Sequence, residues 1–140
     1  MFTFPGVPMV FAGDEIGLTG IDGDGARRPM PWRNDEWDTD VLDGYRALGA
    51  LRQSSRALRH GGLRWVHADD DVLVYLREST DERLLVQVSR ADHRPVVVDR
   101  AMVDGQLGDR RYGPGEASCD ADAIVLPAVG PAAHVWELAS

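Results

Sequence analysis

The sequence of 140 residues contains no lysine, and all fifteen of its basic residues are arginine. With 23 acidic residues the formal net charge is −8, so the chain lacks the basic surface that nucleic-acid binding requires. A single cysteine, Cys119, excludes an internal disulfide. No apolar run approaches the roughly 20 residues that span a membrane. What remains is an ordinary globular composition with room for one domain.

Signals for export, metals and cofactors are also scarce. The N-terminus lacks the basic region, apolar core and small-residue cleavage site of a signal peptide, so we expect a cytoplasmic protein. The four histidines are scattered without metal-ligand spacing. The sequence DGDG at 22–25 resembles the start of a calcium loop, but Ala26 stands at a ligand position and no Glu closes the loop. We therefore expect no metal site and no cofactor.

The most informative stretch runs from Phe4 to Trp32. It begins with an apolar run over 7–12 that stops abruptly at Gly13. An uninterrupted apolar run bounded by glycines predicts a strand buried on both faces, as in parallel sheets. A loop rich in Gly and Asp follows and closes on RRPMPW at 27–32, where α/β enzymes commonly keep their chemistry. No other segment alternates strand and helix to supply the neighbours that a parallel strand needs.

Residues 41–60 carry the clearest helical pattern. Asp40 stands at the position of an N-cap, and the glycines at 61–62 would end the helix. The apolar residues that fall near one face are Val41, Tyr45, Leu48, Leu51 and Leu58. The pattern predicts one helix of about five turns that docks by one side.

From Leu63 onward the apolar period changes to two, which is typical of strands. Six strands are expected, over 63–67, 72–77, 84–89, 95–98, 123–126 and 133–138. Short strands at this spacing predict an antiparallel sandwich. Trp65 and Trp136 lie within these strands, so we expect them in the core. Residues 99–122 are rich in glycine and predict a loose connection.

In this order the strand, loop, helix and sandwich resemble the C-terminal end of an α-amylase superfamily enzyme (glycoside hydrolase family 13). Residues 6–15 are similar to the family's G-x-P-x-I-Y-Y-G-x-E region at its eighth barrel strand. RRPMPW at 27–32 is similar to the R-x-P-M-x-W loop of the maltase, oligo-1,6-glucosidase and neopullulanase-like branch. Residues 45–61 resemble the last barrel helix, and the β-rich remainder resembles domain C, a Greek-key sandwich.

The resemblance implies an α+β fragment, in which the last strand and helix of a (β/α)8 barrel precede an antiparallel β-sandwich. Residues 1–61 would end the catalytic barrel and residues 62–140 would form the sandwich. The complete enzyme would be a retaining glycoside hydrolase or transglycosylase acting on α-glucosidic bonds of maltose, malto- or isomalto-oligosaccharides. The family's catalytic Asp, Glu and Asp precede the region matched here, and the F-x-x-N-H-D motif is absent. The isolated chain is therefore expected to be inactive, with no catalytic residue of its own.

Arg27 matches the family arginine that contacts the sugar in the cleavage pocket, and Met30 and Trp32 would wall the same pocket. A solvated arginine and a loop core are the alternatives. Asp14 and Glu15 are expected to shape the barrel rim, because adjacent residues in extended backbone point to opposite faces.

The partners implied by the resemblance are an α-glucosidic oligosaccharide, bound by the complete enzyme, and the missing barrel portion. Nucleic acids and membranes are not expected as partners. Two alternatives to this interpretation remain open. In the first, the chain is a non-catalytic sugar-binding or scaffold module. In the second, it is one half of a split enzyme that pairs with a barrel portion.

Overall fold

The computed structural model describes residues 1–20 and 29–139, in which helical elements come first and most strands follow. In chain order the elements are η1 (Asp14–Ile16), η3 (Asn34–Glu36), α1 (Thr39–Ser54), α2 (Arg56–His60), β1 (Gly62–Ala68), β2 (Val72–Glu78), β3 (Arg83–Ser89), β4 (Val97–Asp99), α3 (Arg100–Val103), β5 (Gln106–Tyr112), β6 (Ser118–Cys119), β7 (Ala123–Val125) and β8 (Ala132–Ala139). None of the helices in these two ranges is long and apolar enough to cross a membrane. The chain has an α+β architecture dominated by antiparallel sheet.

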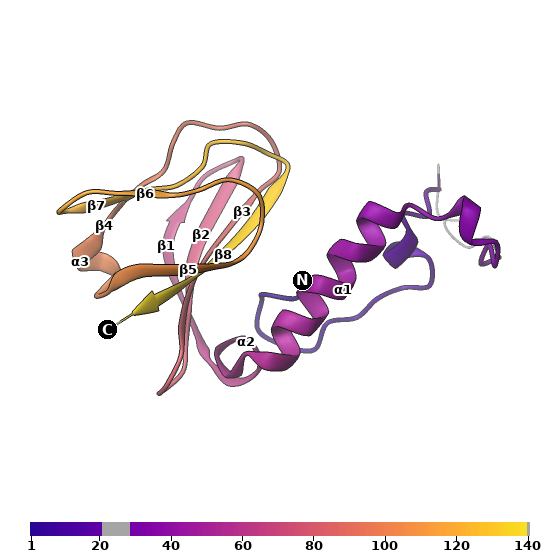
Figure 1. Ribbon diagram of the computed structural model, residues 1–140, viewed down its shortest axis with the longest axis horizontal. Coiled ribbons are helices and arrows are strands. Elements are labelled where there is room, and N and C mark those ends of the chain that lie inside the picture. Colours follow the sequence, from indigo (N-terminus) through magenta and orange to yellow (C-terminus); the bar gives the residue numbers. More distant parts are fainter. Residues whose placement is uncertain (21–28, 140) are drawn as a thin grey trace.

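The strands form a two-layer sandwich, as their period-two pattern predicts. The larger sheet has the order β1-β2-β3-β8-β5, and the smaller sheet has the order β4-β7-β6. Figure 1 shows the smaller sheet on one side of the larger, with α1 on the other side. Leu85, Ile124 and Trp136 meet in the buried layer between the sheets. Their burial supplies the main hydrophobic core of the molecule.

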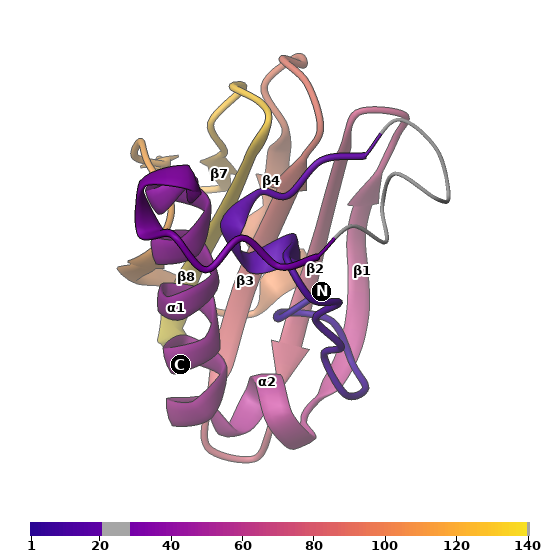
Figure 2. The same cartoon turned by 90° about the vertical axis from the view of Figure 1, so that its right-hand side faces the viewer.

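The opposite face of the larger sheet is covered as well. Leu58 of α2 is buried there together with Tyr75, Leu84 and Val86 of β2 and β3. Because both faces are covered, β2 and β3 are apolar almost throughout, with little alternation. Figure 2 shows the helices and the N-terminal segment in front of these strands. The second core therefore joins the N-terminal part of the chain to the sandwich.

The helix predicted over 41–60 is in fact two helices. The break is at Ser55, whose backbone is extended at φ −91° and ψ 124°. Ser55 Oγ accepts a hydrogen bond from an amide of α2 and donates one to Glu82 Oε2, which holds the break in place. The N-cap is Asp38 and not Asp40, because the Asp38 side chain accepts hydrogen bonds from two amides of the first turn.

The strand predicted over 7–12 is not formed in the described chain, so its place in a barrel stays a prediction. Residues 7–12 have no regular secondary structure, and Val7 and Met9 are 93% and 77% exposed. A parallel strand requires hydrogen-bonded neighbours, whereas the described strands all pair within the two antiparallel sheets. The apolar pattern of this segment therefore has no burial to match it within residues 1–20 and 29–139.

The region 99–122, predicted to be loose, contains three elements, of which β5 is the longest. It pairs with β8, but its register shifts between Leu107 and Arg110 and again between Arg110 and Tyr112. Each irregularity interrupts the alternation of faces, so the strand carries no period-two pattern. Hydrophobic periodicity therefore cannot predict a polar strand whose register shifts.

The two tryptophans that were expected in the core differ. Trp136 is 1% exposed and lies between the sheets, which confirms the prediction. Trp65 is 50% exposed, so for this residue the prediction was wrong. It lies on the outer face of β1, where its ring is 6.0 Å from that of Phe4 and 5.6 Å from that of Tyr75. Trp65 therefore contacts the N-terminal segment and not the sandwich interior.

Candidate functional site

The predicted substrate loop lies between η1 and α1, and its two ends are described. Arg27 and the calcium-like sequence at 22–25 lie outside the described residues. Met30 is half-buried, whereas the Trp32 side chain is 82% exposed. Of the three predicted sugar contacts, one is therefore partly covered by the loop and one projects into solvent.

The turn at the start of this loop is closed by its own carboxylates. Asp14 Oδ2 accepts a hydrogen bond from the Phe11 amide at 3.3 Å, and Glu15 Oε2 accepts one from the Gly13 amide at 2.9 Å. Both acids lie in a 3-10 turn, so the expected extended backbone at this point was wrong. Gly13 has φ 99°, and a Cβ there would lie 2.5 Å from the Leu18 side chain, which explains the glycine. These carboxylates shape the backbone of the turn.

One hydrogen bond joins the two ends of the loop, and a second closes its C-terminal end. The Asp38 amide donates to the Ile16 carbonyl at 3.1 Å, and Trp37 Nε1 donates to the Pro31 carbonyl at 2.7 Å. A hollow of about 200 Å³ lies beside them, lined by Ile16, Gly17, Leu18, Pro29, Pro31 and Glu36. Ligand sites usually enclose roughly 300–1,000 Å³. The hollow beside the described part of the loop is thus too small to be a complete ligand pocket, and this part of the loop can form only one side of such a pocket.

Tyr45 of α1 lies next to the η1 turn. Burial, and secondarily the carboxylates of Asp14 and Glu15, raise the pKa of its phenol. The Phe2 ring meets the Tyr45 ring edge-on at 5.5 Å between centroids. On its other side Tyr45 lines, with Tyr112 of β5, a shallow groove of about 440 Å³. Tyr45 thus links the N-terminal turn, the loop and the sandwich.

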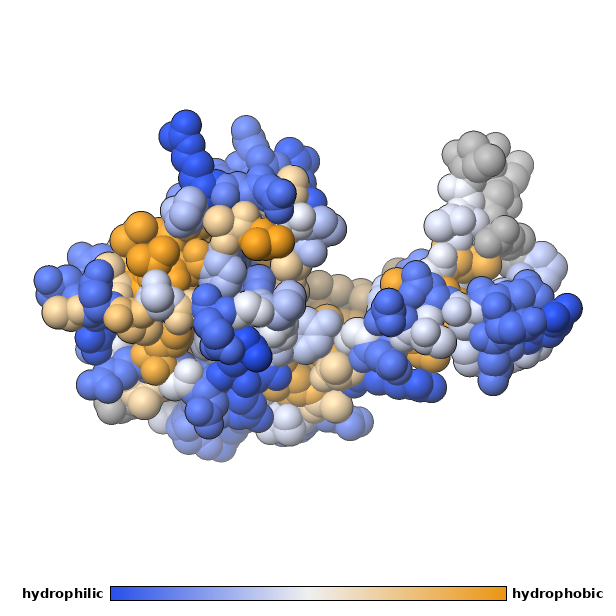
Figure 3. Space-filling view, turned by 45° about the horizontal axis from the view of Figure 1, so that its top comes forward, coloured by the Kyte–Doolittle hydropathy of each residue, from blue (hydrophilic) through white to orange (hydrophobic). Residues whose placement is uncertain are grey.

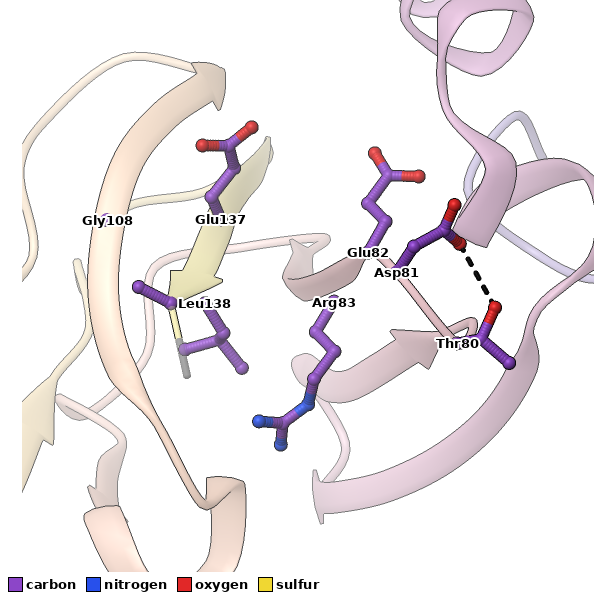
Figure 4. A pocket seen from close by; sticks show the side chains of 8 residues that line it. Thr80, Asp81, Glu82, Arg83, Gly108, Glu137 and Leu138 are labelled. Carbon is purple, nitrogen blue, oxygen red and sulfur yellow. Dashed lines mark hydrogen bonds between the residues drawn. The ribbon is translucent and has the colours of Figure 1, made fainter.

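A second hollow, of about 310 Å³, lies between the β2–β3 hairpin and the end of β8. Figure 4 shows the carboxyls of Glu82 and Glu137 pointing to one side and the guanidinium of Arg83 to the other. Glu82 accepts hydrogen bonds from the start of α2, Arg83 donates to the carbonyls of 103 and 104, and Glu137 pairs with Arg111. These three charged groups therefore all have partners within the fold, and none of them is left unpaired to bind a ligand in the hollow.

The surface of the described chain shows no metal centre. Within residues 1–20 and 29–139 no group of three or more His, Cys, Asp or Glu side chains could hold a metal ion. On the face drawn in Figure 3 the part around α1 is mostly hydrophilic with small apolar areas, and broader apolar areas lie over the sandwich. Among the described residues of the loop, Trp32 presents an exposed aromatic face and Arg33 pairs with Asp35.

Sequence reasoning did not single out two arginines that organise this region. Arg52 and Arg77 both donate to main-chain carbonyls of the first six residues. For Arg77 the sequence did contain a signal, because this arginine lies within the mostly apolar run VLVYLRE at 72–78. Arginine is seldom fully buried unless its donors are paired, so its position in such a run indicates a special role.

Comparison with known proteins finds relatives among curated enzymes and solved structures. No family model matches it. It is 31% identical over 136 residues to a cyclomaltodextrinase of Geobacillus thermopakistaniensis (strain MAS1), an alignment that covers 91% of this chain and 22% of that enzyme. Neopullulanase 2 of Thermoactinomyces vulgaris is 31% identical over 98 residues, covering 69% of this chain and 17% of that protein.

A solved structure agrees with these relatives. The cyclic α-maltosyl-(1→6)-maltose hydrolase of Arthrobacter globiformis superposes with a TM-score of 0.69 at 32% identity, covering 97% of this chain and 28% of that one. The chain thus spans about a fifth of the length of the curated relatives, 22% and 17% for the two named above. It belongs to the α-amylase superfamily, glycoside hydrolase family 13, and corresponds to the C-terminal part of its enzymes.

Proposed function

We propose that the chain supplies the C-terminal part of a retaining glycoside hydrolase or transglycosylase that acts on α-glucosidic bonds. Residues 1–61 would contribute the last barrel strand, the substrate-side loop and the last barrel helix, and residues 62–140 the sandwich. The observation that carries the proposal is the unburied apolar segment 7–12 directly before the loop. Burying a side chain such as Val7 or Met9 stabilises by roughly 1.5–3 kcal/mol, and barrel strands would provide that burial.

The substrate side of the proposal rests on the loop. Arg27, Met30 and Trp32 would face the sugar, because guanidinium forks and aromatic faces suit flat, hydroxyl-bearing ligands. The exposure of Trp32 supports this assignment, since its ring is free to be covered by a ligand or by the barrel. The names of the relatives favour malto-oligosaccharides over other glycosides as the substrate class.

The isolated chain is predicted to be inactive. Retaining hydrolysis needs two carboxyl groups roughly 5–5.5 Å apart, one as nucleophile and one as acid and base. Asp14 and Glu15, the adjacent pair of acids just before the loop, instead accept hydrogen bonds from backbone amides of their own turn. The catalytic carboxyls would come from the barrel portion.

The test compares the purified chain alone with the chain co-expressed with the barrel portion of the Geobacillus cyclomaltodextrinase. We expect no glucose release from maltose or a nitrophenyl α-glucoside by the chain alone, and hydrolysis by the assembly. Arg27→Ala should lower kcat/KM of the assembly by about 10–100-fold, the loss of one or two charge-assisted hydrogen bonds. Arg33→Ala, which removes an exposed pair with Asp35, is the matched control. Activity of the chain alone, or an inactive assembly, would overturn the proposal.

A non-catalytic sugar-binding module is the second candidate, favoured by the exposed Trp32. It predicts a saturable change of tryptophan fluorescence when maltose is added to the chain alone. Trp32→Phe should remove that change, whereas Trp136→Phe, in the sandwich core, should retain it. Absence of any saturable change would exclude this candidate.

A further inference from the structure

Arg77 of β2 is 1% exposed, and its guanidinium binds main-chain carbonyls. Nε donates to Gly62 at 3.1 Å, Nη1 to Thr3 at 2.6 Å, and Nη2 to Ala57 and Gly61 at 2.9 Å each. No carboxylate among the described residues forms an ion pair with it. One buried cation thus joins the N-terminal turn, the end of α2 and the start of β1.

Arg52 of α1 holds the same turn from the helix side. Its Nη1 donates to the carbonyls of Phe2 at 2.8 Å and Phe4 at 3.0 Å, and its Nη2 donates to that of Gly6. The two guanidinium groups bind carbonyls of consecutive residues, Thr3 for Arg77 and Phe2 and Phe4 for Arg52. Burial, and secondarily the charge of Arg52, lower the pKa of Arg77. Together they bind four carbonyls within residues 2–6, which we call the N-terminal turn.

Side chains close the N-terminal turn onto the sheet. Thr3 Oγ1 and Tyr75 Oη share a hydrogen bond of 2.8 Å that is buried. The Phe4 ring lies edge-on to Tyr75 at 5.6 Å and tilted against Trp65 at 6.0 Å. Contacts from β1 and β2 therefore reinforce those of the two arginines.

The choice of arginine is informative. A buried cation without a carboxylate is costly unless its donors are satisfied, and an apolar side chain would avoid that cost. A guanidinium presents five N–H donors in a planar fork, whereas an ammonium offers three donors from one point. At Arg77 four carbonyls surround the fork, one from the N-terminal turn and three from the continuous stretch 57–62 that joins α2 to β1. The feature gained is a fixed geometry between those segments.

We propose that Arg77 and Arg52 are positioning residues that make the N-terminal turn part of the sandwich, so that the sandwich fixes where segment 7–12 begins. This inference rests on the proposed function, in which segment 7–12 is the last barrel strand. That strand leads directly into η1 and the substrate loop. The sandwich would thereby fix the position of the loop relative to the catalytic carboxyls of the barrel.

The anchor itself is tested on the chain alone by amide hydrogen exchange. Arg52→Met removes three hydrogen bonds from a partly exposed side chain outside both cores, so the sandwich should remain folded. Exchange of the Phe4 amide, which donates to the Met1 carbonyl inside the N-terminal turn, should accelerate about 10–100-fold, with exchange in β2 and β3 unchanged. Arg46→Met, which removes an exposed pair on the same helix, is the control and should leave both regions unchanged. Arg77→Lys should release the turn as Arg52→Met does, because the ammonium cannot span the carbonyls.

The positioning role is tested in the assembly with the barrel portion. Arg52→Met should lower kcat for malto-oligosaccharides by about 10–100-fold with little change in KM, the signature of misplaced groups. Unchanged exchange in Arg52→Met would overturn the anchor. A released turn with unchanged kcat would overturn the positioning role. An inactive unsubstituted assembly would refute the proposed function, and the positioning role with it, while the exchange data still decide whether the anchor exists.

Discussion

The N-terminal part and the sandwich solve the problem of apolar side chains in opposite ways. In the sandwich, Leu85, Ile124 and Trp136 are buried between two sheets, and the outer face of the larger sheet is covered by α2. In the N-terminal part, Val7 and Met9 carry an equally apolar pattern but lie in solvent. Pattern alone therefore does not decide burial, because burial also requires a neighbour to pack against.

The contrast also separates two kinds of cohesion. The sandwich is held by area removed from water, which is non-directional and scales with side-chain size. Helix α2 shares the second core, whereas the first six residues are bound by directional hydrogen bonds that involve Arg52, Arg77 and Thr3. Substitutions in the sandwich core should consequently lower the free energy of unfolding more than substitutions in the N-terminal part.

The largest effect is expected from a cavity in the sandwich. Leu85→Ala removes a fully buried side chain from the main core and should lower the free energy of unfolding by about 2–5 kcal/mol. Urea denaturation followed by tryptophan fluorescence measures the change. Leu73→Ala, on the same hairpin but with its side chain exposed, should cost far less. Equal losses in the two variants would contradict the assignment of the core.

A smaller effect is expected at the junction between α1 and α2. The Glu82 carboxylate accepts hydrogen bonds from Ser55 Oγ at 2.9 Å and from the Ala57 amide at 2.7 Å. Glu82→Ala should therefore lower the free energy of unfolding by roughly 1–3 kcal/mol, and Glu82→Gln by less, since the amide oxygen still accepts. Asp81→Ala removes an exposed pair with Arg56 and serves as the control in the same urea titrations. If Glu82→Ala and Asp81→Ala cost the same, the capping role is refuted.

Acidification should destabilise the sandwich through His134. Burial lowers the pKa of this imidazole below its unfolded value, because the charged form is poorly solvated. The folded state then binds fewer protons than the unfolded state as pH falls through about 6.5, so stability decreases below that pH and is fully present above it. His134→Gln should flatten the dependence of the urea midpoint between about pH 7 and pH 5. His60→Gln, at an exposed position, should leave the slope as it is, and an unchanged slope in His134→Gln would disprove the assignment.

The smallest effect is expected in segment 7–12. Val7→Ser and Met9→Ser alter side chains that are already in solvent, so the free energy of unfolding should stay within about 0.5 kcal/mol of the unsubstituted chain. The same variants should weaken assembly with the barrel portion, measured by co-purification, because there these side chains would be buried. A large loss of stability in the chain alone would mean that the segment is packed, and the contrast with the sandwich would disappear.

The sequence predicts the sandwich well because its signals are local. Strands β1, β2, β3, β7 and β8 all follow period-two or apolar runs bounded by turns, and these predictions are confirmed. Strand β5 follows no such period, since its register shifts twice. The break at Ser55 depends on Glu82, a partner 27 residues away that no helical pattern reveals.

The candidate site is less accessible to sequence reasoning. Resemblance supplied Arg27, Met30 and Trp32, and their roles remain predictions. The strand predicted over 7–12 is not formed here because the sandwich offers it no hydrogen-bonded neighbour, and it also stays a prediction. The role of Arg77 was not predicted, because it depends on carbonyls that only the tertiary structure brings together. Functional features that arise from distant contacts leave little trace in local pattern.

The bond between Arg77 and Thr3 also constrains the order in which the chain folds. It connects residues 74 positions apart, and the Thr3–Tyr75 hydrogen bond spans 72. During synthesis Thr3 therefore has neither of these two partners until β2 has left the ribosome, although Arg52 can bind the neighbouring carbonyls earlier. Closing so long a loop costs entropy before any contact rewards it. The beginning of the chain is thus expected to be among the last parts to settle, after the β2–β3 hairpin has formed.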